Sequence, residues 1–285
     1  MLRTIPIFLL LLPAGSASAA LMRYVATEHE SQWRTSSSRL SCVLSHEIPQ
    51  YGRAVFTQAA GGALQLSVEV KRKPQQVGVA RLISAAPSWR HGARERDLGQ
   101  VDYTVASAPF RLVGDIPRRV LNELEQGMYP TLSYPDWADG RDEVQVALSA
   151  VNLRRELGEF LDCLAGMVPF SFDTVRYSSF SYAEGEIELG SAEKARLDEV
   201  ATYLLADTAV ERVTIGSYTD NRGYRSANRQ VSRRRAERVR DYLIARGVSG
   251  KLFSIQAYGE DRPRASNRTA AGRAQNRYLE VTLLK

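Results

Sequence analysis

The sequence predicts two domains: a β-rich amino-terminal domain with two helices, followed by an α/β domain. Three observations lead to this prediction. The chain has 285 residues, enough for two hydrophobic cores. Apolar and polar residues alternate in short runs up to about residue 169, and a βαβαββ succession follows. We therefore expect domains at 21–169 and 170–285, with both helices of the second domain on one face of its sheet.

Residues 1–20 have the features of a secretory signal peptide. Arg3 supplies a positive charge, residues 5–12 form a short apolar core, and small residues allow cleavage after Ala19 or Ala20. This core is too short to span a bilayer, and no later apolar run reaches that length. No cysteine follows the cleavage site, so we expect no lipoprotein anchor. The sequence thus predicts an exported chain without a membrane span.

The chain has two cysteines, Cys42 and Cys163. An even count in an oxidising compartment favours a disulfide between them. Two buried thiols are the alternative. A zinc site is disfavoured because there is no CxxC pair and because His29, His46 and His91 are scattered, so we expect no metal or other cofactor.

In the first domain, apolar–polar alternation predicts strands at 63–71, 77–85, 101–107 and 143–148. Two amphipathic helices are expected, at 117–125 with Val120, Leu121 and Leu124 inward, and at 152–166 with Leu157, Phe160, Leu161 and Leu164 inward. The aromatic runs 23–27, 87–90 and 129–137 are interpreted as loops whose rings plug the core. There is no GxSxG, HExxH, Walker or cysteine–histidine signature, so we do not expect an enzyme.

In the second domain, strands are expected at 174–180, 212–217, 252–258 and 278–284. The first helix is expected to begin at an N-cap, Ser191, with Glu193 in its first turn, where an acidic side chain suits the helix dipole. Its apolar residues follow helical spacing: Leu197, Val200, Ala201, Leu204 and Leu205. The second helix is basic, with Val231, Val239, Tyr242 and Leu243 inward and Gly247 just past its end.

The turn between the strand at 212–217 and the basic helix holds the candidate site. Asp220 can bond to its own backbone, and Gly223 can take a positive φ. This places Asp220 at a strand end and Arg235 on the next helix. A carboxylate and a guanidinium presented together suit a zwitterionic ligand. Two alternatives stay open: Asp220 only caps the turn, and Arg235 lies on a solvated helix face.

Charge is divided unevenly along the chain. Residues 211–285 carry 17 Lys and Arg against 7 Asp and Glu, a net charge of +10, whereas the whole chain carries +6. Such a basic segment is typical of nucleic-acid binding. The export signal argues against that partner, as does the lack of aromatic residues among the arginines of the helix. An anionic cell wall fits the charge and the compartment better.

The second domain resembles the OmpA-like peptidoglycan-binding family, which includes domains of OmpA, Pal and MotB. The matching positions are Thr219, Asp220, Gly223, Asn228, Val231, Ser232, Arg235 and Ala236, then Tyr258-Gly259, Pro263, Asn267, Thr269, Gly272-Arg273 and Asn276-Arg277. The resemblance implies that Asp220 takes the ammonium and Arg235 the carboxylate of diaminopimelate in the peptidoglycan stem peptide. It places Thr219 and Asn228 close by and Arg277 as a buttress. Tyr218 departs from the family, where many members have histidine.

The first domain resembles the amino-terminal domain of the MotY family through RYVATEHESQW at 23–33, CVLSHEIPQYGRAVF at 42–56 and YPTLSYPDW at 129–137. That family belongs to polar, mostly sodium-driven flagellar motors. The resemblance implies a periplasmic protein that associates with the flagellar basal body and helps to capture or hold stator units. It also implies an intradomain disulfide at the two cysteines.

Two rival hypotheses remain. A general envelope tether of the Pal or OmpA kind would be unrelated to flagella and would leave motility normal on deletion. A cell-wall enzyme would use the second domain only for targeting, but no converging nucleophile, base or metal group can be assembled from the sequence.

Overall fold

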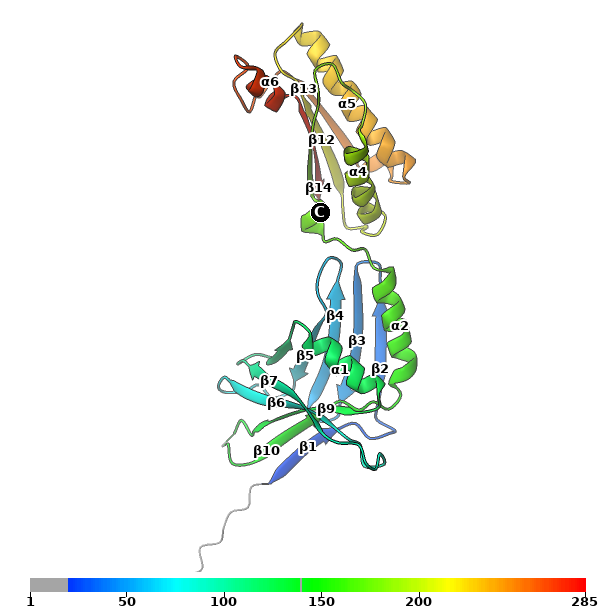
Figure 1. Cartoon of the computed structure of the whole chain (residues 1–285), viewed down its shortest axis with the longest axis vertical. Helices are drawn as coiled ribbons and strands as arrows, with labels where there is room; N and C mark the ends of the chain where they lie inside the picture. Colours follow the sequence, from blue (N-terminus) through cyan, green and yellow to red (C-terminus); the bar gives the residue numbers. More distant parts are fainter. Residues whose placement is uncertain (1–19, 139) are drawn as a thin grey trace, which may run out of the picture. The chain divides into compact units, whose positions relative to one another are not determined.

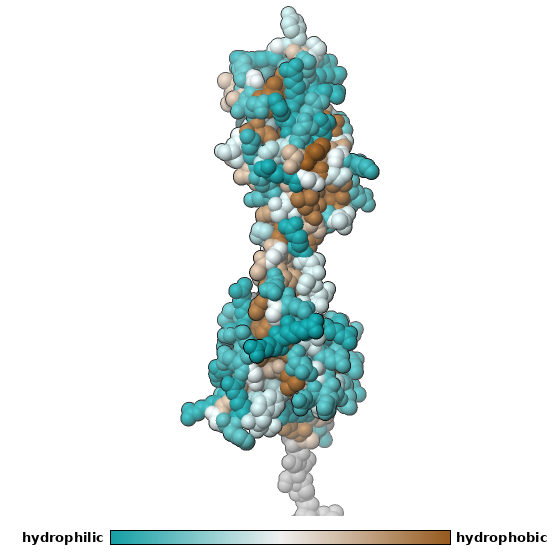
Figure 2. Space-filling view, turned by 90° about the vertical axis from the view of Figure 1, so that its right-hand side faces the viewer, coloured by the Kyte–Doolittle hydropathy of each residue, from teal (hydrophilic) through white to brown (hydrophobic). Residues whose placement is uncertain are grey.

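The computed structural model describes residues 20–138 and 140–285 (Figure 1). Contacts between Cα atoms divide the chain into two compact units. The first comprises Met1–Trp33, Ser45–Val55 and Leu66–Leu153, and the second comprises Arg34–Leu44, Phe56–Gln65 and Arg154–Lys285. The predicted signal peptide, except Ala20, lies outside the described residues. None of the helices in the described part is long and apolar enough to cross a membrane. The face drawn in Figure 2 is mostly hydrophilic, with smaller hydrophobic areas.

A ten-stranded sheet makes the amino-terminal half β-rich, as predicted, in the order β1-β10-β9-β6-β7-β8-β5-β4-β3-β2. Its strands are β1 (Leu21–Val25), β2 (Trp33–Ser37), β3 (Ser41–Ile48), β4 (Gly52–Ala59), β5 (Gln65–Val70), β6 (Gly78–Ala85), β7 (Arg96–Tyr103), β8 (Phe110–Leu112), β9 (Tyr129–Pro135) and β10 (Glu143–Ala147). β1 pairs with β10 in parallel, whereas β10 with β9, β9 with β6 and β6 with β7 are antiparallel. β7 begins and ends earlier than the predicted strand 101–107.

Two of the runs interpreted as loops are strands instead. Run 23–27 belongs mostly to β1, and run 129–137 forms β9, which lies between β10 and β6. β9 was missed because Pro130 and Pro135 mark breaks in most strands. Here the carbonyl of Pro130 still accepts a hydrogen bond from the N–H of Leu148, so the proline supplies the one backbone group it retains. Tyr129 and Tyr134 are buried, as expected, whereas Tyr24 and Trp137 are half-buried. In the third run, 87–90, Trp89 is 60% exposed, so the prediction that its ring lies in the core was wrong.

Both predicted helices of the first domain are present, α1 (Ile116–Glu125) and α2 (Leu153–Gly166). α1 buries the three expected residues. In α2, Leu157 and Phe160 are buried, but Leu161 is 47% exposed, so the prediction that it faces inward was wrong. Cys163 of α2 forms a disulfide with Cys42 of β3, and their Cα atoms are 5.9 Å apart. The helix is thereby tied to the strand.

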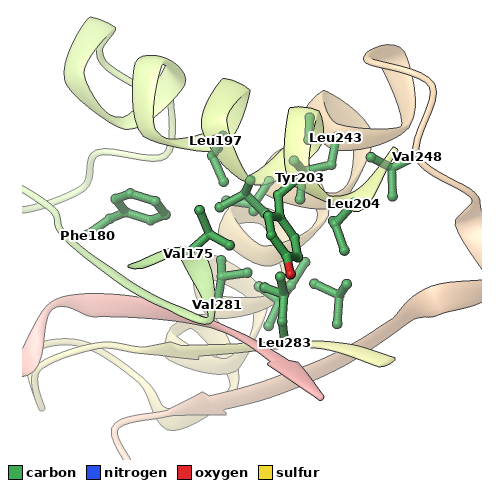
Figure 3. Packing of buried hydrophobic residues seen from close by; sticks show 14 of the residues in the cluster. Val175, Phe180, Leu197, Tyr203, Leu204, Leu243, Val248, Val281 and Leu283 are labelled. Carbon is green, nitrogen blue, oxygen red and sulfur yellow. The ribbon is translucent and has the colours of Figure 1, made fainter. Parts of the chain in front are cut away.

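The carboxy-terminal half forms a four-stranded sheet in the order β11-β14-β12-β13. Its elements are α3 (Phe172–Val175), β11 (Tyr177–Ser181), α4 (Ser191–Leu204), β12 (Arg212–Tyr218), α5 (Arg225–Ala245), a 3-10 turn at Gly250–Leu252, β13 (Phe253–Gly259), α6 (Ala270–Asn276) and β14 (Tyr278–Leu284). α4 and α5 cover one face of the sheet (Figure 1). Leu197 and Leu204 of α4 and Leu243 of α5 pack there against Val281 and Leu283 of β14 (Figure 3). The predicted α/β architecture is confirmed.

Local details differ at two element starts. The expected strand at 174–180 begins only at Tyr177, because Ser171 caps the short helix α3 and its hydroxyl accepts from the N–H of Thr174. The N-cap of α4 is Gly190 rather than Ser191. The predicted end of the basic helix is confirmed, since Gly247 has φ +95° directly after α5.

Candidate functional site

The candidate site lies where β12 ends and the chain turns toward α5. The N–H of Thr219 donates to the carbonyl of Gly259 at 2.7 Å, which fixes the start of the turn to the end of β13. Asp220 Oδ1 accepts from the N–H of Arg222 at 3.0 Å, and Gly223 has φ +89°. Both features of the predicted turn are present, so Asp220 does cap the turn with one carboxylate oxygen.

The other carboxylate oxygen of Asp220 has a different partner. Arg277, between α6 and β14, donates from Nη1 to Asp220 Oδ2 at 2.7 Å. Arg277 Nε also donates to the carbonyl of Tyr182, whose N–H donates to the carbonyl of Arg277. The arginine therefore joins three segments of the fold and holds the carboxylate in place.

Arg235 is the largest fully buried side chain of the described residues, with 1% of its surface exposed. The alternative that it lies on a solvated helix face is therefore wrong. Its Nε donates to the carbonyl of Glu186 at 2.7 Å, and weaker bonds reach the carbonyls of Tyr218 and Ala183. Its guanidinium carbon lies 4.3 Å from the centroid of the Tyr182 ring. Burial lowers the pKa of Arg235.

Arg235 has no carboxylate partner among the described residues, in contrast to Arg277. Backbone carbonyls satisfy part of its hydrogen-bonding capacity but do not neutralise its charge. A buried guanidinium without a counter-ion is costly, so this position favours an incoming anion. Two buried hydroxyls nearby, Thr219 Oγ1 and Tyr182 OH, also lack a hydrogen-bond partner in the part of the chain that the structure describes.

Asn228, in the first turn of α5, lies beside Asp220. Its side-chain nitrogen donates to the carbonyl of Asp220 at 3.3 Å and to Glu260 Oε2 at 2.6 Å. The structure thus brings together all five residues expected at this site. Sequence reasoning missed Tyr182 and Glu260, because nothing in their local sequence distinguishes them from core and loop residues.

Tyr218, the residue that departs from the family pattern, belongs to an aromatic stack. Its ring is stacked between Tyr258 and Tyr278, with centroid distances of 4.8 and 4.2 Å. Its hydroxyl donates to Glu280 Oε1 at 3.0 Å, and burial raises its pKa. The side chain is therefore held by these neighbours, and the carbonyl of Tyr218 accepts a hydrogen bond from Arg235 Nη1.

Most of the exposed charge on α5 is paired. Arg225 and Arg229 form ion pairs with Asp261, Arg238 pairs with Glu188, and Arg240 pairs with its neighbour Asp241. Among the described residues, no group of three or more His, Cys, Asp or Glu side chains could hold a metal ion. What the site offers is a held carboxylate, a buried cation and two spare hydroxyls, which together suit a small zwitterionic group.

Comparison with known proteins shows which families the two parts of the chain match. Residues 24–169 match the MotY N-terminal domain, and residues 181–277 match the OmpA family. The sodium-type flagellar protein MotY of Vibrio parahaemolyticus is 33% identical over 280 residues, which cover 97% of this chain and 95% of that protein. The peptidoglycan-binding protein ArfA of Mycobacterium tuberculosis is 47% identical over 72 residues, which cover 25% of this chain and 22% of ArfA.

Among solved structures, the peptidoglycan-associated lipoprotein from Burkholderia pseudomallei aligns with a TM-score of 0.36 and 26% identity, over 37% of this chain and 89% of that one. The fold and the matched segments define a two-domain protein with an OmpA-type domain at its carboxy-terminal end. The chain belongs to the MotY family of flagellar motor proteins. Both resemblances noted in the sequence are confirmed.

Proposed function

We propose that the carboxy-terminal domain, residues 170–285, anchors the chain to peptidoglycan by binding the free end of diaminopimelate in the stem peptide. Asp220 accepts the ligand's ammonium and Arg235 donates to its carboxylate, with Thr219 and Asn228 beside them. The observation that carries this proposal is the burial of Arg235 without a carboxylate partner among the described residues. A ligand carboxylate would supply the missing negative charge.

In this proposal the amino-terminal domain, residues 21–169, associates with the flagellar basal body and helps to assemble or hold stator units. Membership of the MotY family supports this role. The protein works in the periplasm after removal of the signal peptide at residues 1–20, and it acts as a scaffold rather than as an enzyme. Nucleic acid is not a partner, and the pairing of most arginines on α5 with carboxylates supports that exclusion.

Co-sedimentation of the mature protein with purified sacculi tests the anchor. Asp220→Asn and Arg235→Gln remove each charge at similar side-chain size and so limit damage to the fold, and Arg234→Gln on the exposed side of α5 is the matched control. We expect each site variant to bind at least about tenfold more weakly, because a charged hydrogen bond is lost at each end of the ligand. The control should pellet like the wild type.

If the folded wild type stays in the supernatant, or if both site variants pellet normally, the proposed anchor is contradicted.

The motor role has its own test. Deletion of the gene should abolish or weaken swimming while envelope integrity stays normal. Normal swimming with a leaky envelope would instead support a general envelope tether.

A further inference from the structure

Strand β1 lies at one edge of the ten-stranded sheet. It pairs in parallel with β10 and takes the outermost place in the strand order (Figure 1). Edge strands present a row of unpaired N–H and C=O groups that can pair with another chain. β1 is also the first described strand, and Leu21 within it is 57% exposed. This edge is therefore open to a further strand.

The backbone direction along β1 follows from one hydrogen bond. The N–H of Glu143 in β10 donates to the carbonyl of Ala20, and Leu21 lies opposite Glu143 in the register. Because backbone groups alternate in direction along a strand, Ala20, Met22 and Tyr24 turn theirs toward β10. The N–H and C=O groups of Leu21, Arg23 and Val25 then point away from the sheet. No described residue forms a hydrogen bond with them.

Two hollows flank this strand, one on each of its faces. Met22 and Tyr24 border the first, of about 510 Å³, and Arg23 and Val25 border the second, of about 550 Å³. Alternate side chains of a strand point to opposite faces, so a new strand beside β1 would place successive side chains over the two hollows in turn. This combination of a free edge and alternating pockets is the arrangement used for recognition of extended peptides.

The chemistry of the hollows indicates the side chains that fit them. Lys71 and Arg72 border the first hollow, and neither forms an ion pair within the described part of the chain. Asp136 and Asp142 also border this hollow and carry negative charge, but each already accepts a backbone N–H, so Lys71 and Arg72 are the charged groups there whose side chains remain without a partner among the described residues.

The second hollow is bordered mostly by apolar and aromatic side chains, among them Trp89, which is 60% exposed, and Tyr129, with Arg23 and Glu28 as its charged members. Acidic side chains therefore suit the first hollow, and apolar ones the second.

We propose that β1 binds an extended peptide segment of a partner protein as an additional strand. Residues of this segment alternate between carboxylate side chains over the Lys71 and Arg72 hollow and apolar side chains over the Trp89 hollow. The backbone groups of Leu21, Arg23 and Val25 supply the main-chain hydrogen bonds. This peptide site is separate from the peptidoglycan site around Asp220, because every residue that forms it belongs to the first unit.

The probe for this site is an acetylated and amidated heptapeptide in which glutamate alternates with valine. Amide hydrogen exchange of the mature full-length protein is measured with and without the peptide at millimolar concentration. We expect exchange at Arg23 and Val25 to slow by about tenfold, since each gains a main-chain hydrogen bond or the shelter of one. Unchanged exchange along β1 would overturn the proposal.

Backbone methylation separates strand pairing from side-chain contact. Two versions of the peptide carry N-methyl groups on alternate amides, one version on the amides that face β1 and the other on those that face away. Only the first should lose the effect, because methylation removes the donor and blocks close approach. Equal behaviour of the two versions would also overturn the proposal.

A pair of protein variants gives an independent check. Arg23→Pro removes the outward N–H of β1 without removing a donor to β10, which an edge strand tolerates. Arg23→Ala removes the side chain but keeps the N–H. Peptide binding should be lost in the first and kept within about threefold in the second, because main-chain bonds provide the affinity. If Arg23→Pro lowers the melting temperature sharply, binding of the methylated peptides to wild-type protein tests strand pairing instead.

Self-association through β1 is the competing outcome. Sedimentation velocity over a range of concentrations shows whether copies of this chain pair at the same edge. A dimer that does not bind the peptide and that Arg23→Pro abolishes would show that β1 pairs with a second copy of this chain. That result would contradict the proposal of a partner protein.

Discussion

Arg277 and Asp220 form an ion pair of 2.7 Å within the candidate site, with side-chain exposures of only 16% and 6%. This pair places a counter-charge beside the largely buried carboxylate of Asp220. The pair also shows that the two charged residues expected to bind the ligand have different partners. Asp220 is held by a neighbouring cation, whereas Arg235 is held by backbone carbonyls.

Removing Arg277 should destabilise the carboxy-terminal domain. Arg277→Met leaves Asp220 buried without its counter-charge, and breaking one partner of such a pair costs about 3 kcal/mol of unfolding free energy. Urea unfolding followed by far-UV circular dichroism measures the loss. Arg277→Met combined with Asp220→Asn should lose less than the two single changes together, because the pair acts as a unit. Additive losses would show that the contact contributes little.

Tyr218 should stabilise the domain through its stack and its hydrogen bond. Tyr218→Phe keeps the ring between Tyr258 and Tyr278 but loses the donor to Glu280, and we expect a loss of about 1 kcal/mol. Tyr218→Ala removes both stacked pairs and should lose about 3 kcal/mol or more. Equal effects of the two changes, measured by thermal unfolding, would contradict a role for the stack. Sacculus binding by folded Tyr218→Phe should be unchanged.

His46 should make stability fall in mild acid. The strand period of β3 places its side chain in the core, where the ring stacks on Trp33 with a centroid distance of 4.4 Å and Nδ1–H donates to the carbonyl of Gln32. Nε2 is buried and has no partner among the described residues. Burial lowers the pKa of His46 to about 4, from its usual 6.5. The neutral ring is therefore the form that the fold accepts.

The direction of the pH effect follows from this depressed pKa. Between pH 6.5 and 4 the unfolded chain binds a proton that the folded chain does not bind. The contribution of the neutral His46 ring to the free energy of unfolding is fully present above pH 6.5. It decreases as the pH falls toward 4, by about 3 kcal/mol in total. Trp33 fluorescence during urea unfolding at several pH values reports the change. His46→Gln should flatten this pH dependence, whereas His91→Gln, at an exposed site, should not.

The disulfide should stabilise the fold strongly because Cys42 and Cys163 are 121 residues apart in the sequence. In the chain-entropy model, losing a link over such a loop costs about 4–5 kcal/mol. The double variant Cys42→Ser/Cys163→Ser should unfold at lower urea than the oxidised wild type and should resemble the wild type under reducing agent. If reduction leaves the wild-type midpoint unchanged, the bond is not a source of stability. Loss of swimming in Cys42→Ser at normal protein level and fold would argue against a purely stabilising role.

Local sequence patterns predicted most elements of the carboxy-terminal domain. The apolar residues of α4 follow i, i+3, i+4 spacing, and those of β12 alternate with polar ones. Each pattern indicates which face of the element is buried, and it can be read from neighbouring residues alone. Gly223 and Gly247 were predictable for a similar reason, because a positive φ favours glycine whatever lies nearby. β9 was missed because its prolines argue against a strand, although pairing on both sides stabilises it.

The burial of individual residues in the candidate site could not be predicted from their neighbours along the chain. The sequence placed Asp220 and Arg235 on adjacent elements, and the family pattern connected them with Asn228 and Arg277. It did not reveal that Arg235 is buried, since arginines on either side of it are exposed. Burial of one arginine among many depends on contacts with Tyr182 and Glu186, which lie about fifty residues away in the chain.

By itself, the sequence determined the β-rich and α/β character of the two halves, the export signal as a prediction, and the family to which the chain belongs. The first two depend on periodicity and composition, which are local properties, and the family follows from the resemblance of the chain's motifs to those of known families. Only the tertiary structure decided that Arg277 is the partner of Asp220, that Arg235 lacks a carboxylate partner among the described residues, and that β1 is an open sheet edge. Each of these depends on which segments meet in space, and that is set by packing the whole domain.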